Sequence, residues 1–317
     1  MTREPMSFEG VFAVPPLARS TDGRREIDLD ENGRIVRHIA KGGIRNLIYG
    51  GNAFLYHLTL REYQQLLEWL SQLTDDGFVC IPSAGPSWGR LMDQAPLLRR
   101  FGISTVMVLP CGDPRDAVGI GQGLREFAES SGTRILAYVK EESNLGSDIE
   151  CGLDMLAGLV ADGVCIGIKY AMVRKDPGVD PYLKALLERV DRAKVISGIG
   201  ERPAIAHLRD WMLPGFTTGA GCLAPSQSMA ILRACQRGNF AGAAQLREHF
   251  LPLEDLRDLW GPARVLHHAV ELAGIATTGT IPPFVSSLSA EQQKRIEPIA
   301  AELMLSESAS LVSGNAR

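Results

Sequence analysis

The strand-like run GVCIGIK, residues 163–169, is apolar except for the lysine at its end, Lys169. Burial disfavours the charged form of an amine and lowers its pKa. Moving a lysine pKa from about 10.4 to near 7 costs on the order of 4 to 5 kcal/mol, which apolar walls could supply. A neutral amine attacks carbonyl carbon, so Lys169 is a candidate for Schiff-base chemistry. The alternative is an interior lysine that pairs with a carboxylate or reaches solvent.

A tyrosine, Tyr138, stands near the end of the preceding apolar run, RILAYVK, residues 134–140. A phenol beside an imine-forming amine can donate and accept the protons that carbinolamine collapse and aldol cleavage require. A core tyrosine whose hydroxyl bonds to the backbone is the alternative. We predict that Tyr138 and Lys169 act together.

A third candidate group follows the run at 45–51, where the chain reads Gly-Gly-Asn-Ala at residues 50–53. Glycines let backbone N–H groups approach an anion closely, and the asparagine adds a polar side chain. We expect Gly51, Asn52 and Ala53 to hold a substrate carboxylate. A tight turn is an equally good interpretation of this short motif.

These candidates lie at the ends of apolar, β-branched runs that recur along the chain. The runs start roughly 20 to 35 residues apart, which is the length of a strand, a helix and two loops. Strands that are apolar nearly throughout indicate a parallel sheet covered by helices, and eight of them close a (β/α)8 TIM barrel, an α/β fold. Chemistry in such barrels sits at the C-terminal ends of the strands. The eight runs span 10–17, 45–51, 78–82, 104–110, 134–140, 163–169, 194–198 and 214–219.

The segments between the runs have helical period. In residues 61–73 the apolar positions recur every three or four residues, and Thr59 and Glu62 form a capping box before them. From residue 225 onward only helical patterns remain, at 228–238, 241–260, 262–274 and 290–305. We therefore predict a barrel over 1–237 and a C-terminal helical extension over 238–317, with a frayed tail from Ser306.

Composition excludes several classes of function. The 317 residues are 45% hydrophobic and 22% charged with a net charge of -4, so no broad basic surface suits nucleic acid or a membrane. No leader-like segment and no apolar stretch of about 18 residues occurs, which indicates a cytoplasmic protein. The six cysteines lack CxxC spacing and are expected to be reduced. No metal-ligand grouping or dinucleotide fingerprint occurs, so we expect neither metal nor cofactor.

Together these motifs resemble the dihydrodipicolinate synthase and N-acetylneuraminate lyase superfamily of pyruvate-handling class I aldolases. The resemblance spans about residues 10–298 and rests on GVFAVPPL, the GG loop before LTLREY, Tyr138, GIK with Lys169, SGIGE and GFTTGAGCLAPS, in this order. It implies that Lys169 forms an imine with pyruvate or another 2-keto acid and that Tyr138 relays protons. It also places the substrate carboxylate at the loop after the second strand and implies a homo-oligomer, a dimer or tetramer. Gly198 of SGIGE is an expected substrate contact.

The chain also departs from the superfamily pattern. GTTGE after the second strand is replaced by GGNAFLYHLT, the tyrosine pair after the fourth strand by residues 109–112, and YNVPGR by YVKEES. The last change removes an arginine that binds the second substrate, so we do not expect lysine biosynthesis. Among the polar residues that are new at this face, His57 could serve as an acid or base and Arg174 could bind a carboxylate with its guanidinium fork.

Three hypotheses follow from the sequence. The first is a cytoplasmic lyase that forms a Schiff base on Lys169 and performs reversible aldol cleavage of a 2-keto acid or dehydration of a sugar acid. The second is a barrel that binds a keto acid without turnover. The third is a phosphate-binding isomerase that uses the glycines at 198–200 and 219–221, a hypothesis that gives Lys169 no role.

Overall fold

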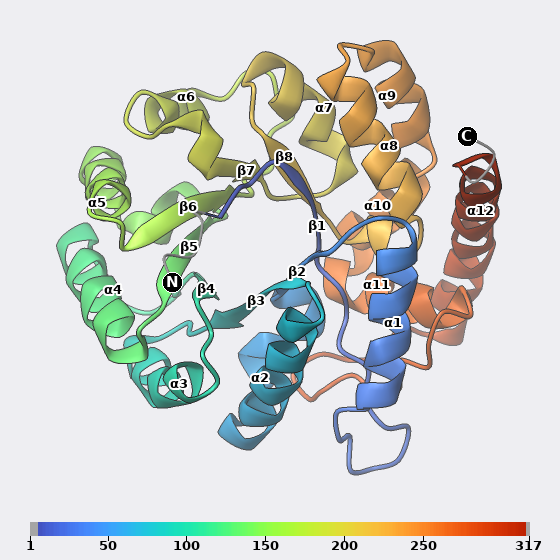
Figure 1. Ribbon diagram of the computed structural model, residues 1–317, viewed down its shortest axis with the longest axis horizontal. Helices are drawn as coiled ribbons and strands as arrows, with labels where there is room; N and C mark the ends of the chain where they lie inside the picture. The colour runs from blue at the N-terminus through green and yellow to red at the C-terminus, as the bar shows by residue number, and fades with distance from the viewer. Residues whose placement is uncertain (1–5, 315–317) are drawn as a thin grey trace.

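The computed structural model describes residues 6–314, and it forms a closed barrel of eight parallel strands in the order β1 to β8 (Figure 1). Each strand pairs with the next, and β1 pairs with β8 to close the barrel. All eight predicted strands are present, so the predicted (β/α)8 barrel is confirmed. The strands are β1 Gly10–Ala13, β2 Asn46–Tyr49, β3 Val79–Ala84, β4 Thr105–Val108, β5 Arg134–Val139, β6 Cys165–Tyr170, β7 Val195–Ser197 and β8 Gly215–Thr218.

One helix follows each strand, and the helices ring the barrel (Figure 1). The capping box predicted at Thr59 and Glu62 is confirmed, since both of its hydrogen bonds form at the start of α2. Asp28, Asp148 and Asp180 cap other helices by accepting hydrogen bonds from first-turn N–H groups. These helices are α1 Leu29–Lys41, α2 Leu60–Asp75, α3 Trp88–Arg100, α4 Ala117–Ser131, α5 Ile149–Ala161, α6 Pro181–Leu187, α7 Glu201–Asp210 and α8 Pro225–Gln236.

The C-terminal part is helical, with α9 Phe240–Glu248, α10 Leu251–Trp260, α11 Pro262–Leu272 and α12 Ala290–Gly314. The stretch 241–260 was expected to be one helix, but it breaks into two before Pro252. Proline lacks the N–H that a continuous helix would need there, so it starts α10 instead. The tail expected to fray from Ser306 is helical as far as Gly314, because the buried carboxylate of Glu307 accepts hydrogen bonds from Ser226. Residues 315–317 of that tail lie outside the described residues.

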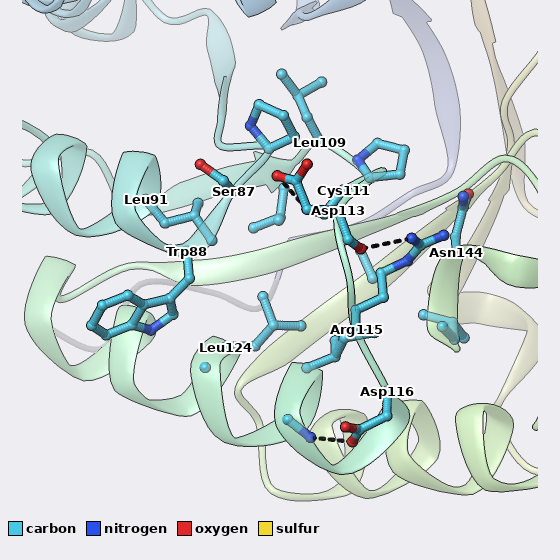
Figure 2. Close-up of a pocket in the computed structure, with 18 of the residues that line it drawn as sticks. Ser87, Trp88, Leu91, Leu109, Cys111, Asp113, Arg115, Asp116, Leu124 and Asn144 are labelled. Atoms are coloured by element: carbon cyan, nitrogen blue, oxygen red, sulfur yellow. Dashed lines mark hydrogen bonds between the residues drawn. The ribbon is translucent and has the colours of Figure 1, made fainter. Parts of the chain in front are cut away.

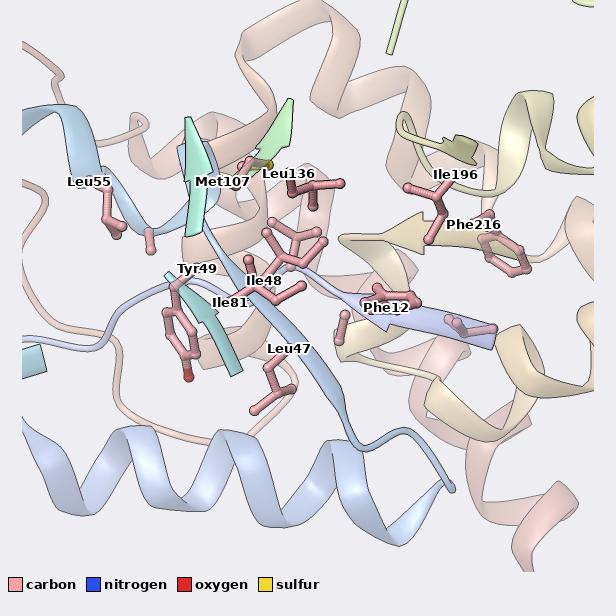
Figure 3. Packing of buried hydrophobic residues seen from close by; sticks show 14 of the residues in the cluster. Phe12, Leu47, Ile48, Tyr49, Leu55, Ile81, Met107, Leu136, Ile196 and Phe216 are labelled. Atoms are coloured by element: carbon pink, nitrogen blue, oxygen red, sulfur yellow. The ribbon is translucent and has the colours of Figure 1, made fainter. Parts of the chain in front are cut away.

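The strands are buried on both faces, and their side chains form the core of the molecule. Figure 3 shows side chains from several strands, among them those of Phe12, Ile48 and Phe216, packed together. This dense packing fixes the positions of the strand ends and surrounds them with apolar side chains. Within the described residues, no helix is both long and apolar enough to cross a membrane.

Candidate active site

Lys169 lies in β6 with its side chain almost entirely buried, 5% exposed. It pairs in register with Tyr138 of β5, and its Nζ lies 4.2 Å from the centroid of the tyrosine ring. No carboxylate of residues 6–310 comes within 4.0 Å of this nitrogen. The amine therefore neither points into bulk water nor pairs with an acid, which are the two alternatives to a reactive lysine.

Burial, together with the positive charges of Arg257 and Lys140, lowers the pKa of Lys169 to about 7. An amine with this pKa is uncharged in a substantial fraction of molecules near neutral pH. The neutral form carries the lone pair that attacks a ketone. The sequence-based expectation of a pKa near 7 agrees with this value.

Tyr138 is the candidate acid beside the amine. Burial raises the pKa of its phenol well above the usual 10, and the neighbouring Tyr56 adds to the shift. The hydroxyl is therefore protonated at neutral pH and can donate to a departing oxygen. Because Tyr138 and Lys169 are register partners on adjacent strands, the barrel itself fixes their separation.

A cavity of about 690 Å³ opens above these two residues at the C-terminal ends of the strands. Six of the sequence-predicted site residues line it: Lys169, Tyr138, Gly51, Asn52, Gly198 and Arg174. Ala53 and His57 are not part of its wall. Ala53 is fully buried, and the ring of His57 is exposed and stacks on Phe284 with the ring centroids 5.7 Å apart.

The loop after β2 forms two short 3-10 turns, η1 Gly51–Ala53 and η2 Leu55–His57. Within it the N–H groups of Ala53 and Leu55 donate to the carbonyl of Gly50, and the N–H of Phe54 donates to that of Gly51. The side chain of Asn52 donates to the carbonyl of Val14 at 2.8 Å, which holds it at the end of β1. The N–H groups of residues 53–55 are therefore used within the turns of the loop, and Gly51 and Asn52 are the parts of the motif that face the cavity.

Arg174 lines the cavity but already has partners. Its Nε lies 3.0 Å from a carboxylate oxygen of Asp180, and its Nη2 lies 2.7 Å from Glu142. Asp180 also accepts a hydrogen bond from the hydroxyl of Tyr170. A substrate carboxylate at Arg174 would have to share the guanidinium with these two acids.

A second cavity of about 500 Å³ lies beside α3 and α4 (Figure 2). Its wall is mostly apolar and includes Trp88, Leu91 and Leu124. Arg115 crosses it and donates to the carbonyls of Asp113 and Ser143. Tyr138 lines both cavities, whereas Lys169 lines only the larger one. The larger cavity is therefore the candidate active site.

Solved structures resemble the chain over nearly its whole length. Dihydrodipicolinate synthase from Oceanobacillus iheyensis is 22% identical, covers 93% of this chain and 96% of its own, and has a TM-score of 0.79. The synthase from Thermotoga maritima is 18% identical, with 95% and 100% covered and a TM-score of 0.79. The chain has the fold of the dihydrodipicolinate synthases. A prophage protein of E. coli that belongs to the dihydrodipicolinic acid synthase family, solved in complex with pyruvate, is 18% identical with a TM-score of 0.77 over 94% and 99% of the two chains.

Comparison by sequence alone finds less. No model of a known protein family matches the chain, and no curated protein matches it. At identities of this size the structural likeness establishes the dihydrodipicolinate synthase fold, and the reaction has to be argued from the site.

Within this dihydrodipicolinate synthase-like barrel, the C-terminal helices contribute cavity residues that the sequence analysis missed. Glu254 and Arg257 of α10 line the same cavity as Lys169. They stand three residues apart and so share one face of their helix. That spacing was visible in the sequence, but no local pattern indicates that this face covers the mouth of the barrel.

Glu254 forms a buried pair with Glu201 at the start of α7. The N–H of Glu201 donates to Glu254 at 3.0 Å, and the hydroxyl of Ser228 donates to Glu201 at 2.6 Å. Burial, together with the charge of Glu201, raises the pKa of Glu254 to about 8. Burial and the repulsion between the two carboxylates favour keeping one of the two groups protonated near neutral pH. Gly200 makes room for the pair, since its φ is 85° and a Cβ there would lie 2.2 Å from Glu254.

Proposed function

We propose that the protein is a lyase of the dihydrodipicolinate synthase and N-acetylneuraminate lyase superfamily that forms a Schiff base between Lys169 and a 2-keto acid. The observation that carries the proposal is the buried amine of β6, which has a pKa near 7, no acidic partner among residues 6–310, and a tyrosine ring beside it. The fold and the roomy cavity above the amine support it. No cofactor is needed for this chemistry, because the imine itself accepts electrons.

The proposed reaction begins when the neutral Nζ of Lys169 adds to the keto carbon. Tyr138 donates a proton to the resulting hydroxyl, water leaves, and a protonated imine forms. The phenolate of Tyr138 then takes the proton of the hydroxyl on the fourth carbon. The bond between the third and fourth carbons breaks, its electron pair moves toward the imine, and the products are a free aldehyde and an enamine on Lys169. Protonation of the enamine and hydrolysis return the keto acid and free Lys169. Loss of a proton from the third carbon, followed by departure of the hydroxyl of the fourth carbon as water, would give dehydration instead.

The remaining predicted contacts belong to substrate binding. Gly51, Asn52 and Gly198 face the cavity and are our proposed contacts for the keto acid. Arg174 stays a proposed contact that shares its guanidinium with Glu142 and Asp180. Ala53 and His57 would reach a substrate only after the loop that follows β2 rearranges.

We also propose, from the superfamily resemblance alone, a cytoplasmic homo-oligomer, either a dimer or a tetramer. Analytical ultracentrifugation of the purified protein measures the oligomeric state directly. A protein that sediments as a monomer at micromolar concentration would contradict that part of the proposal.

Trapping with borohydride tests the chemistry. The protein is incubated with pyruvate or another 2-keto acid, reduced, digested and analysed by mass spectrometry for a modified Lys169. Lys169→Ala and the exposed-lysine variant Lys184→Ala serve as controls, because only the first should abolish the adduct. An adduct spread over surface lysines would contradict the proposal.

A second candidate function is a barrel that binds a keto acid without turnover. The internal N–H bonds of the loop after β2 favour it, since they leave few groups to orient a substrate carboxylate. Release of pyruvate from any sugar acid would eliminate this candidate. Stabilisation by keto acids with no turnover across a substrate panel would favour it over the lyase.

A further inference from the structure

Arg257 reaches from α10 into the cavity above Lys169 and lies against the end of β8. The contact is close, because a Cβ on Gly219 would come within 2.4 Å of Nη2 and 2.9 Å of Nη1 of this arginine. Both Arg257 and Gly219 line the cavity. The glycine thus leaves the space in which the guanidinium lies, directly after the last barrel strand.

The guanidinium of Arg257 differs from those of the other arginines in the cavity wall. Arg174 pairs with Glu142 and Asp180, and Arg202 pairs with Asp255. Arg257 donates from Nε to the carbonyl of Pro262 at 3.3 Å. In the part of the chain with described side chains, no carboxylate lies within 4.0 Å of its nitrogens, and neither Nη atom has a hydrogen-bond partner.

An arginine with two open Nη groups at the wall of a cavity is suited to a bidentate contact with an oxyanion. Its charge also acts on the reacting amine, since it is one of the causes that lower the pKa of Lys169. The cavity of about 690 Å³ is far larger than a three-carbon keto acid requires. A longer substrate would extend from Lys169 toward the helices that cover the mouth, where α10 presents this cation.

We propose that Arg257 binds a second carboxylate of the substrate, at the end remote from the keto carbon. The inference rests on the proposed Schiff-base function and narrows its substrate class to 2-keto acids that carry two carboxylates. Gly219 acts as a positioning residue, because it keeps open the space in which the guanidinium lies.

Two five-carbon acids of similar shape test the proposal, 2-oxoglutarate with a terminal carboxylate and 2-oxovalerate with a terminal methyl group. The measurement is the half-saturating concentration of each acid for the borohydride-trapped adduct on Lys169. We expect 2-oxoglutarate to saturate the protein at a concentration about 10-fold to 100-fold lower. Equal half-saturating concentrations for the two acids in the unmodified protein would overturn the proposal.

Variants separate recognition from the effect of Arg257 on the lysine. Arg257→Gln should raise the pH at which both acids react with Lys169. Because this effect is the same for both acids, it cancels in the ratio of their half-saturating concentrations, 2-oxovalerate over 2-oxoglutarate. That ratio should fall to near one. Arg257→Lys keeps the charge and loses the fork, so the ratio should be intermediate. Gly219→Ala should also lower the ratio, since its Cβ displaces the flexible end of Arg257. Arg233 is exposed on α8, so Arg233→Gln should leave the ratio unchanged. An Arg257→Gln variant that still prefers 2-oxoglutarate as strongly as the unmodified protein would overturn the proposal.

Failure of this proposal is distinguishable from failure of the Schiff-base function. An adduct with 2-oxovalerate supports the lysine chemistry whatever Arg257 binds. If no acid is trapped, thermal stabilisation by glutarate, which has two carboxylates and no ketone, still tests the site. If glutarate stabilises the unmodified protein but not Arg257→Gln, the carboxylate contact is supported. If glutarate does not stabilise the unmodified protein, the contact is overturned. Thermal stabilisation by inorganic phosphate at a lower concentration than glutarate needs would overturn the assignment of this site to a carboxylate.

Discussion

Replacing Lys169 with methionine should stabilise the protein, and by an amount that depends on pH. The pKa of this lysine falls from 10.5 to about 7 on folding. At 1.36 kcal/mol per unit, the folded state bears a penalty on the order of 5 kcal/mol below pH 7. Methionine has a similar length and carries no charge, so it fits the apolar walls of the site.

The sign follows from proton binding. Between pH 7 and 10.5 the unfolded chain keeps the proton that the folded protein releases, so the stability of the unmodified protein rises with pH. The penalty is fully present below the folded pKa and disappears as pH approaches 10.5. The advantage of Lys169→Met should therefore shrink by about 1.4 kcal/mol for each pH unit above 7.

Chemical denaturation of both proteins at pH 7, 8 and 9 measures this slope. Lys184→Met is the matched control, since Lys184 is exposed on α6 and its replacement should give a difference that does not change with pH. A constant difference between Lys169→Met and the unmodified protein over this range would refute the reasoning, because it would show that the folded lysine keeps its usual pKa.

Three other changes have defined outcomes. Tyr138→Phe should slow trapping of Lys169 by about 100-fold or more while leaving ligand-induced stabilisation intact, because it removes a proton donor and little volume; an unchanged trapping rate contradicts the relay. Glu254→Gln should make the free energy of unfolding fall less as pH rises from 5 to 8, since a carboxyl whose pKa is raised from 4.5 to about 8 binds its proton more tightly in the folded state over that window. Denaturation at pH 5 and 8 measures this fall, and an unchanged pH dependence would argue against a raised pKa at Glu254. Thr59→Ala should lower the free energy of unfolding by about 1 kcal/mol through loss of the α2 cap, and an unchanged denaturation midpoint would contradict this.

The sequence predicts the barrel well because its strands are buried on both faces. Each strand then appears as a short apolar run with a helical segment after it, and the runs at 134–140 and 163–169 place Tyr138 and Lys169 at neighbouring strand ends. Their register and the buried state of the amine follow from this arrangement.

What the sequence does not predict depends on packing between distant segments. The α10 face that bears Glu254 and Arg257 meets the barrel mouth only after the chain has folded, and helical period alone does not indicate which surface a helix covers. The positions of Ala53 and His57 depend on the tight turns of the loop after β2, which a short glycine motif leaves open. The tail after Ser306 is helical because Glu307 meets Ser226, a contact between residues far apart in the chain.

The pH dependence of imine formation on Lys169 tests the central claim most directly. The rate of borohydride-trapped adduct formation with pyruvate should rise with a midpoint near pH 7, and mass spectrometry should place the adduct on Lys169 alone. A midpoint above pH 10, or an adduct on other lysines that persists in Lys169→Ala, would contradict the account.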